Sequence, residues 1–198
     1  FKEKLESGDI TKNIDLVIPN VEMRVTPVTS KGKPINIHCL FNPKIEQELD
    51  ERFFQKVRIP SGRGFSATRK DLIHFGRYFQ GDDQLAEDAA YKVGVENFVV
   101  DWSKIKELFE ADPILRSNTI VAVSNSSQDG ASGIVRHSDY FSNGGKWSQL
   151  EPHRREIYKL SDAIFSSNEK DVRFFYGEAP EYTSRCGSPK PCIHGSDA

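Results

Sequence analysis

Short, continuously apolar runs recur along this chain, and helical patterns separate most of them. The runs are Ile14–Ile18, Ile35–Phe41, Thr119–Val123, Asp162–Phe165 and one that opens at Cys192. Strands that are apolar throughout and are joined by helices imply parallel pairing, with helices covering the sheet. The sequence therefore predicts an α/β fold, and an open doubly wound sheet and a closed barrel both fit it.

Helix signals fill the intervals between these runs. Asn42 is expected to cap a helix that begins at Pro43, and Thr68 is expected to cap a second one. Residues 82–110 have a further helical pattern, which Asp112 ends because a proline follows it. The apolar face of this last segment consists of Trp102, Ile105, Leu108 and Phe109.

The length of the chain limits the number of domains, and its net charge limits the ligands that it can attract through overall electrostatics. At 198 residues it is long enough for one domain with a sizeable core, so we expect a single α/β domain over residues 1–198. The formal net charge of -2 gives no bulk attraction to nucleic acid or to an anionic membrane. Any phosphate-bearing ligand must therefore be held by local chemistry.

Other whole-chain features predict a cytoplasmic location. No apolar run approaches the roughly 18 residues needed to span a bilayer, and the N-terminus lacks the apolar region of a signal peptide. The three cysteines are an odd set without metal-finger spacing, which argues against a disulfide framework and a structural zinc site. The missing initiator Met and the end in mid-strand indicate part of a longer chain.

Polar residues stand where several of the predicted strands end, and in both candidate architectures this is the edge that carries the ligand site. Glu22, His38, Asn125 and Asp197 are the principal ones. A carboxylate, an imidazole and a second carboxylate are ligands of mixed N and O type that suit first-row divalent metals. Each also has a structural explanation: Glu22 as a solvated charge, His38 as a core histidine and Asp197 as a helix cap.

A polar, glycine-rich loop over residues 124–133 follows the clearest buried strand. Backbone N–H groups and hydroxyls in such a loop can cradle a phosphate, and Ser126, Ser127 and Gly130 are the residues we expect to do so. The loop lacks the spacing and the lysine of a P-loop. A serine-rich turn without a ligand is the alternative.

Several of these motifs together resemble the PHP (polymerase and histidinol phosphatase) family of phosphoesterases. They are Glu22 after a strand, His38 within residues 37–43, and the terminal segment 195–198. Residues 127–133 and 161–168 look like the PHP-like region of TrlF-type proteins, which join this domain to an AAA-like ATPase. The resemblance runs from about Ile14 to Ala198 and rests on the order and spacing of these motifs.

The resemblance implies a distorted TIM-like barrel, here an incomplete fragment of one, that binds zinc, manganese or iron. Its activity would be hydrolysis of phosphodiester or phosphomonoester bonds in nucleic acid or a nucleotide. Glu22, His38 and Asp197 would be metal ligands, and Asn125 would stand where many members have a histidine. The family's opening His-x-His motif is absent. The alternative is a metal-depleted module that binds nucleic acid or regulates an ATPase domain in the same chain.

Overall fold

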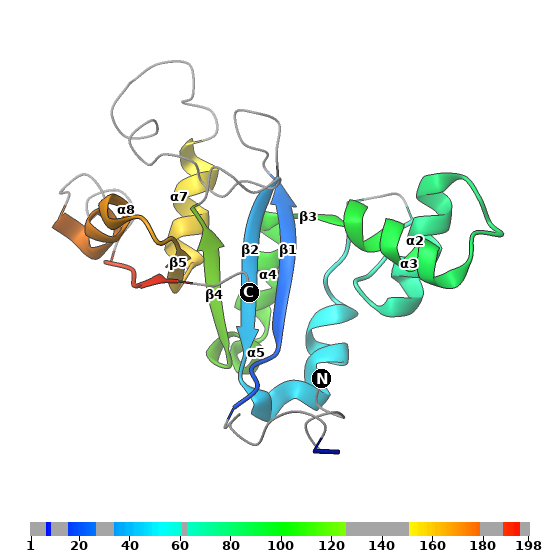
Figure 1. Ribbon diagram of the computed structural model, residues 1–198, viewed down its shortest axis with the longest axis horizontal. Helices are drawn as coiled ribbons and strands as arrows, with labels where there is room; N and C mark the ends of the chain where they lie inside the picture. Colours follow the sequence, from blue (N-terminus) through cyan, green and yellow to red (C-terminus); the bar gives the residue numbers. More distant parts are fainter. Residues whose placement is uncertain are drawn as a thin grey trace.

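In the computed structural model, a six-stranded sheet carries its helices mainly on one side (Figure 1). The structure describes residues 7–8, 16–26, 34–60, 63–125, 151–178 and 188–194, without the side chains of 151–155. The strands are β1 (Asn20–Thr26), β2 (Ile35–Phe41), β3 (Val99–Asp101), β4 (Thr119–Ser124), β5 (Ala163–Phe165) and β6 (Cys192–Ile193). They lie in the order β3-β1-β2-β4-β5-β6. The fold is therefore mixed α/β with an open, mostly parallel sheet.

One strand departs from the parallel pairing that the sequence predicts. β2 is antiparallel to both of its neighbours, β1 and β4, whereas every other neighbouring pair is parallel. Residues 27–34 join β1 to β2, and this connection is too short for the crossover that parallel neighbours need. The expectation of parallel pairing throughout was wrong at the centre of the sheet for this reason.

The start of the sheet also differs from the prediction. Residues 16–19 are not in a strand, and β1 begins at Asn20, so Glu22 lies inside a strand instead of just after one. The helix expected over residues 82–110 is divided by β3, whose three residues are too few to show a strand pattern in the sequence.

Helices account for most of the other described residues. They are η1 (Pro43–Glu48), η2 (Asp50–Phe54), α2 (Arg69–Gln80), α3 (Glu87–Asn97), α4 (Trp102–Ala111), α5 (Pro113–Ser117), α7 (Glu151–Leu160), α8 (Glu169–Arg173) and η3 (Phe174–Glu178). The predicted caps are confirmed: the Asn42 side chain accepts from Lys44 N, and that of Thr68 accepts from Asp71 N. No helix among the described residues is long and apolar enough to cross a membrane.

The core lies on the face of the sheet that the helices cover. Side chains at alternate positions of β1 and β2 point to this face because successive strand residues alternate. In Figure 1, α4, α5 and α7 lie behind β1, β2 and β4, and no described helix lies in front of these strands. The buried hydrophobic strand residues of this covered face are Met23, Val25, Ile35, Ile37, Cys39, Phe41, Val100, Val121, Val123 and Ile164.

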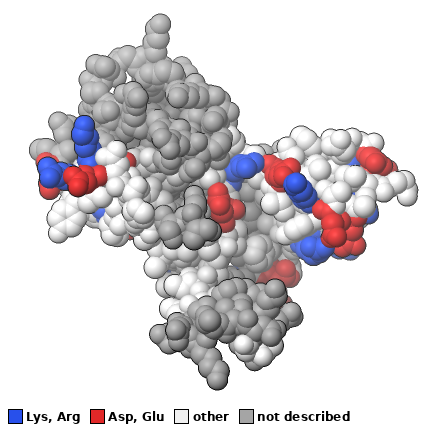
Figure 2. Space-filling model, viewed as in Figure 1, with Lys and Arg blue, Asp and Glu red and all other residues white. Residues whose placement is uncertain are grey.

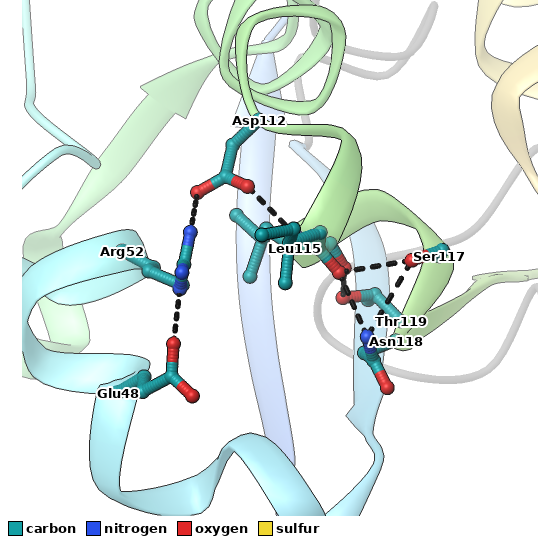
Figure 3. A network of polar contacts seen from close by, with 8 residues as sticks. Glu48, Arg52, Asp112, Leu115, Ser117, Asn118 and Thr119 are labelled. Atoms are coloured by element: carbon teal, nitrogen blue, oxygen red, sulfur yellow. Dashed lines mark hydrogen bonds and ion pairs between the residues drawn. The ribbon is translucent and has the colours of Figure 1, made fainter.

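A polar network fixes the short helices below the sheet to α4 and α5 (Figure 3). Arg52 donates from Nε to Glu48 at 2.6 Å and from Nη1 to Asp112 at 2.8 Å. The other oxygen of Asp112 accepts from Leu115 N and caps α5. This backbone hydrogen bond, together with Arg52, lowers the pKa of Asp112. Arg52 thus pairs with both Glu48 and Asp112, and we assign this network to folding.

The helices α2 and α3 form a tightly packed hairpin beside β1. A Cβ at Gly76 would collide with the carbonyl of Ala90, and one at Gly94 would collide with the carbonyl of Leu72, so both positions require glycine. Arg24 Nη1 donates to the Glu96 carbonyl at 2.7 Å, which ties α3 to β1. The hairpin is thereby held next to the edge of the sheet.

Candidate functional site

Glu22 and His38 lie side by side on the face of the sheet opposite the core. They are cross-strand partners in the antiparallel pair of β1 and β2. Phe41 N donates to Pro19 O at 2.8 Å, which makes 19 and 41 a hydrogen-bonded pair and therefore makes 22 and 38 a non-hydrogen-bonded pair. Side chains in such pairs approach most closely, so the carboxylate and the imidazole can share one ligand.

Amide side chains on the same face orient this pair. Asn36 Nδ2 donates to Glu22 Oε1 at 2.6 Å, and Asn20 Nδ2 lies 3.3 Å from His38 Nδ1. The His38 ring also packs edge-on against Phe165, with 4.5 Å between the ring centroids. Since an amide N–H can only donate, His38 Nδ1 accepts in this arrangement and Nε2 carries the proton of the neutral ring. A half-turn of the exposed Asn20 amide would reverse the tautomer and free Nε2 for a metal.

The environment of His38 keeps its ring neutral. Burial lowers the pKa of His38 from its ordinary value, and the nearby Glu22 carboxylate only partly offsets this effect. A neutral imidazole is the form that binds a metal ion or accepts a proton. His38 therefore has the protonation state that a ligand needs at neutral pH.

Asn125 lies in a second polar cluster, at the ends of β4 and β5. Its backbone N donates to Phe165 O at 3.0 Å, and its side-chain Nδ2 donates to Asp171 Oδ2 at 2.7 Å. Ser166 Oγ donates to the same carboxylate oxygen at 2.7 Å. Ala122 pairs with His38, so alternation directs Asn125, three positions later, to the other face of the sheet. The structure thus brings Glu22 and His38 together and places Asn125 with Asp171.

The other predicted site residues fall outside the part of the chain that the structure describes. These are Asp197 and the predicted phosphate-binding residues Ser126, Ser127 and Gly130. Their proposed roles stay predictions. His194, which follows β6, is described and its side chain is exposed.

Sequence reasoning missed two residues that organise these clusters, Asn36 and Asp171. Asn36 stands two positions before His38 in a strand whose other residues are apolar. Residues two apart in a strand point to the same face, and this pattern could have placed Asn36 beside the candidate site. The buried Asp171 sits in the short helix α8, and no sequence pattern indicated its burial. Asn36 and Asn125 each keep a buried Oδ1 that has no hydrogen-bond partner among the described residues, and their donation to carboxylates fixes which amide atom is the oxygen.

Two limits on function follow from the described geometry. Within the described ranges, no group of three or more His, Cys, Asp or Glu side chains is placed to hold a metal ion. Figure 2 shows acidic and basic side chains intermixed over the lobe formed by α2 and α3, without the single-sign patch of a phosphate-backbone interface. No family model, curated protein or solved structure matches the chain.

Proposed function

We propose that this domain is a metal-dependent phosphoesterase of the PHP type, with its metal held between Glu22 and His38. The observation that carries the proposal is the cross-strand pairing of these two residues on the face of the sheet without described helices. Two residues that the sequence places sixteen positions apart become nearest neighbours. The proposed fold is a distorted barrel of which the open sheet forms part.

The two side chains fit part of a coordination shell. Glu22 is exposed and His38 is neutral, so both can donate to zinc, manganese or iron. A divalent ion supplies Lewis-acid activation of water and neutralises charge that builds on phosphoryl oxygens. Asn36 holds the Glu22 carboxylate in place through its 2.6 Å hydrogen bond. Asp197 would complete the shell, and the substrate would be a nucleic acid or a nucleotide.

The proposal is tested by metal binding and by turnover of a generic phosphodiester. Manganese and zinc affinities are measured by calorimetry, and hydrolysis of bis(p-nitrophenyl) phosphate is measured with each metal. We expect Glu22→Gln and His38→Gln each to weaken binding by about a hundredfold and to remove metal-stimulated turnover. Glu51→Gln and His74→Gln change exposed residues of the same types elsewhere and should have no effect.

The contrary result is equally clear. A protein that binds no metal, or whose turnover is the same in the Glu22→Gln, His38→Gln double variant, is not the proposed enzyme. The measurement is best made on the longest chain available, because Asp197 belongs to the last few residues of the sequence.

The second candidate is a metal-depleted module that binds nucleic acid or regulates an attached ATPase domain. The observation in its favour is that the described residues supply a pair of ligands instead of three. Elemental analysis that finds no metal in a folded, full-length protein, together with binding of single-stranded DNA in EDTA, would favour this function. Stoichiometric metal would count against it.

A further inference from the structure

A groove of about 540 Å³ runs along one edge of β1, between the sheet and the α2–α3 hairpin. β3 pairs with β1 only along Arg24–Thr26, so among the described strands none pairs with residues 20–23 on that side. The groove is lined by five consecutive residues of β1, Asn20 to Arg24. Consecutive residues point to opposite faces of a sheet, so it is the edge of the strand that faces the groove.

Backbone groups of β1 point into this groove. The bond from Phe41 N to Pro19 O shows that Pro19 accepts from β2 and that residues 21 and 23 exchange their backbone hydrogen bonds with β2. The N–H and C=O groups of Asn20 and Glu22 must then point to the opposite side, where the groove lies. An extended peptide is the ligand that matches such a row of donors and acceptors.

The groove walls define which side chains the added strand would carry. On the covered side the wall is apolar, and it consists of Phe54, Ala67, Leu72, Tyr91, Val95 and Phe98. On the open side, the Glu22 carboxylate accepts a hydrogen bond from the Asn36 amide. The Glu96 carboxylate lies 3.9 Å from Lys92 Nζ, which is a long ion pair. The Arg24 guanidinium donates to the backbone carbonyl of Glu96. A strand laid here therefore meets apolar contacts on one face and, on the other, the carboxylates of Glu22 and Glu96 beside the single guanidinium of Arg24.

We propose that the edge of β1 along residues 20–23, which no described strand occupies, is a docking site for an extended segment of another protein with alternating apolar and basic residues. The segment would pair with residues 20–23 of β1 on the side that faces the α2–α3 hairpin. It would lie in line with β3, which pairs with residues 24–26 of the same strand edge. Its apolar residues would pack on the helical wall, and its basic residues would lie opposite Glu22 and Glu96. This inference does not depend on the proposed phosphoesterase activity.

The test uses a fluorescent octapeptide of alternating valine and lysine, with the protein in EDTA so that no metal competes for Glu22. We expect saturable binding that weakens at high salt and slowed hydrogen exchange at the amides of Asn20 and Glu22. The amides of Val21 and Met23 already pair with β2 and should change little. N-methylation of the peptide amides should weaken binding by about tenfold or more.

Variants and control peptides distinguish docking in the groove from nonspecific binding. Val95 is 48% exposed in the groove wall, and Val95→Asp should weaken binding by about tenfold without unfolding the protein. Ile114→Asp changes a similarly exposed residue, at 52%, outside the groove, and should leave binding unchanged. An octapeptide of alternating valine and glutamate should bind more weakly than the lysine peptide.

Several results would overturn the proposal. They are the absence of saturable binding, binding that survives N-methylation, equal binding of the glutamate peptide, or unchanged exchange at Asn20 and Glu22. Protection of these two amides that grows with protein concentration in the absence of peptide would instead identify a second copy of this chain as the occupant, and would reject an extended segment of another protein. Because all measurements are made in EDTA, a failure here leaves the metal-binding test of Glu22 and His38 untouched.

Discussion

The two faces of the central sheet differ in the burial and polarity of their side chains, although the same strands form both. On the covered face, β1 and β2 present Met23, Val25, Ile35 and Ile37 to the helices, and each is buried. On the open face, the alternate positions of the same strands include Glu22 and His38, which meet each other across the pair. The covered face forms the hydrophobic core, and the open face carries the polar pair. The difference teaches that side-chain parity, more than position along a strand, separates core residues from candidate site residues here.

Truncating one isoleucine on each face should give the largest contrast. Ile37 is fully buried on the covered face, so Ile37→Ala should lower the free energy of unfolding by about 3 kcal/mol through lost burial and a cavity. Ile120 lies on the open face and is 51% exposed, so Ile120→Ala should cost less than about 1 kcal/mol. Urea denaturation measures both. Equal losses would mean that the open face is packed as firmly as the covered one.

The two buried asparagines should differ by less. Asn125→Ala removes a donor from the buried Asp171 carboxylate and should cost about 2 to 3 kcal/mol. Asn36→Ala removes a donor from Glu22, which is exposed and can be solvated, so we expect a loss of about 1 kcal/mol. Both are measured by urea denaturation at neutral pH. A larger loss at Asn36 would show that the open face contributes more to stability than its exposure indicates.

The smallest expected effect is a pH dependence from His38. Burial lowers the pKa of His38 below its ordinary value of 6.5, so the folded protein binds this proton less readily than the unfolded chain. The resulting stability is fully present above pH 6.5 and is lost as the pH falls through the lowered pKa. His38→Gln should flatten this part of the curve of unfolding free energy between pH 8 and 5. An unchanged slope would place the titrating group elsewhere.

Much of the covered face could be predicted from sequence, because burial leaves a local pattern. The apolar runs at 35–41 and 119–123 became β2 and β4, and Asn42 and Thr68 cap helices as expected. β3 could not be predicted, since three residues carry too little pattern to separate a strand from the helices beside it.

The candidate site was predictable only in part. Glu22 stood out as a polar residue just after a predicted strand, and His38 stood out within an apolar strand, but we attributed their meeting to the carboxyl ends of parallel strands. They meet because β2 runs antiparallel to β1 and the strand register places residue 22 directly opposite residue 38. Asn125 was expected with them, and its amide instead donates to Asp171 in α8. The apolar alternation fixes which side chains face the core, but which residue of a distant strand stands opposite Glu22 is decided only when the strands pair.

By itself, the sequence determined which residues of this protein prefer the core, because apolar periodicity and capping are local properties of the chain. The tertiary structure decided what those elements bring together: the antiparallel placement of β2, the Glu22–His38 pair, and the edge of β1 that β3 leaves unpaired. The physical reason is that strand order and register depend on the packing of distant segments. Both proposals made for this molecule rest on such long-range pairings.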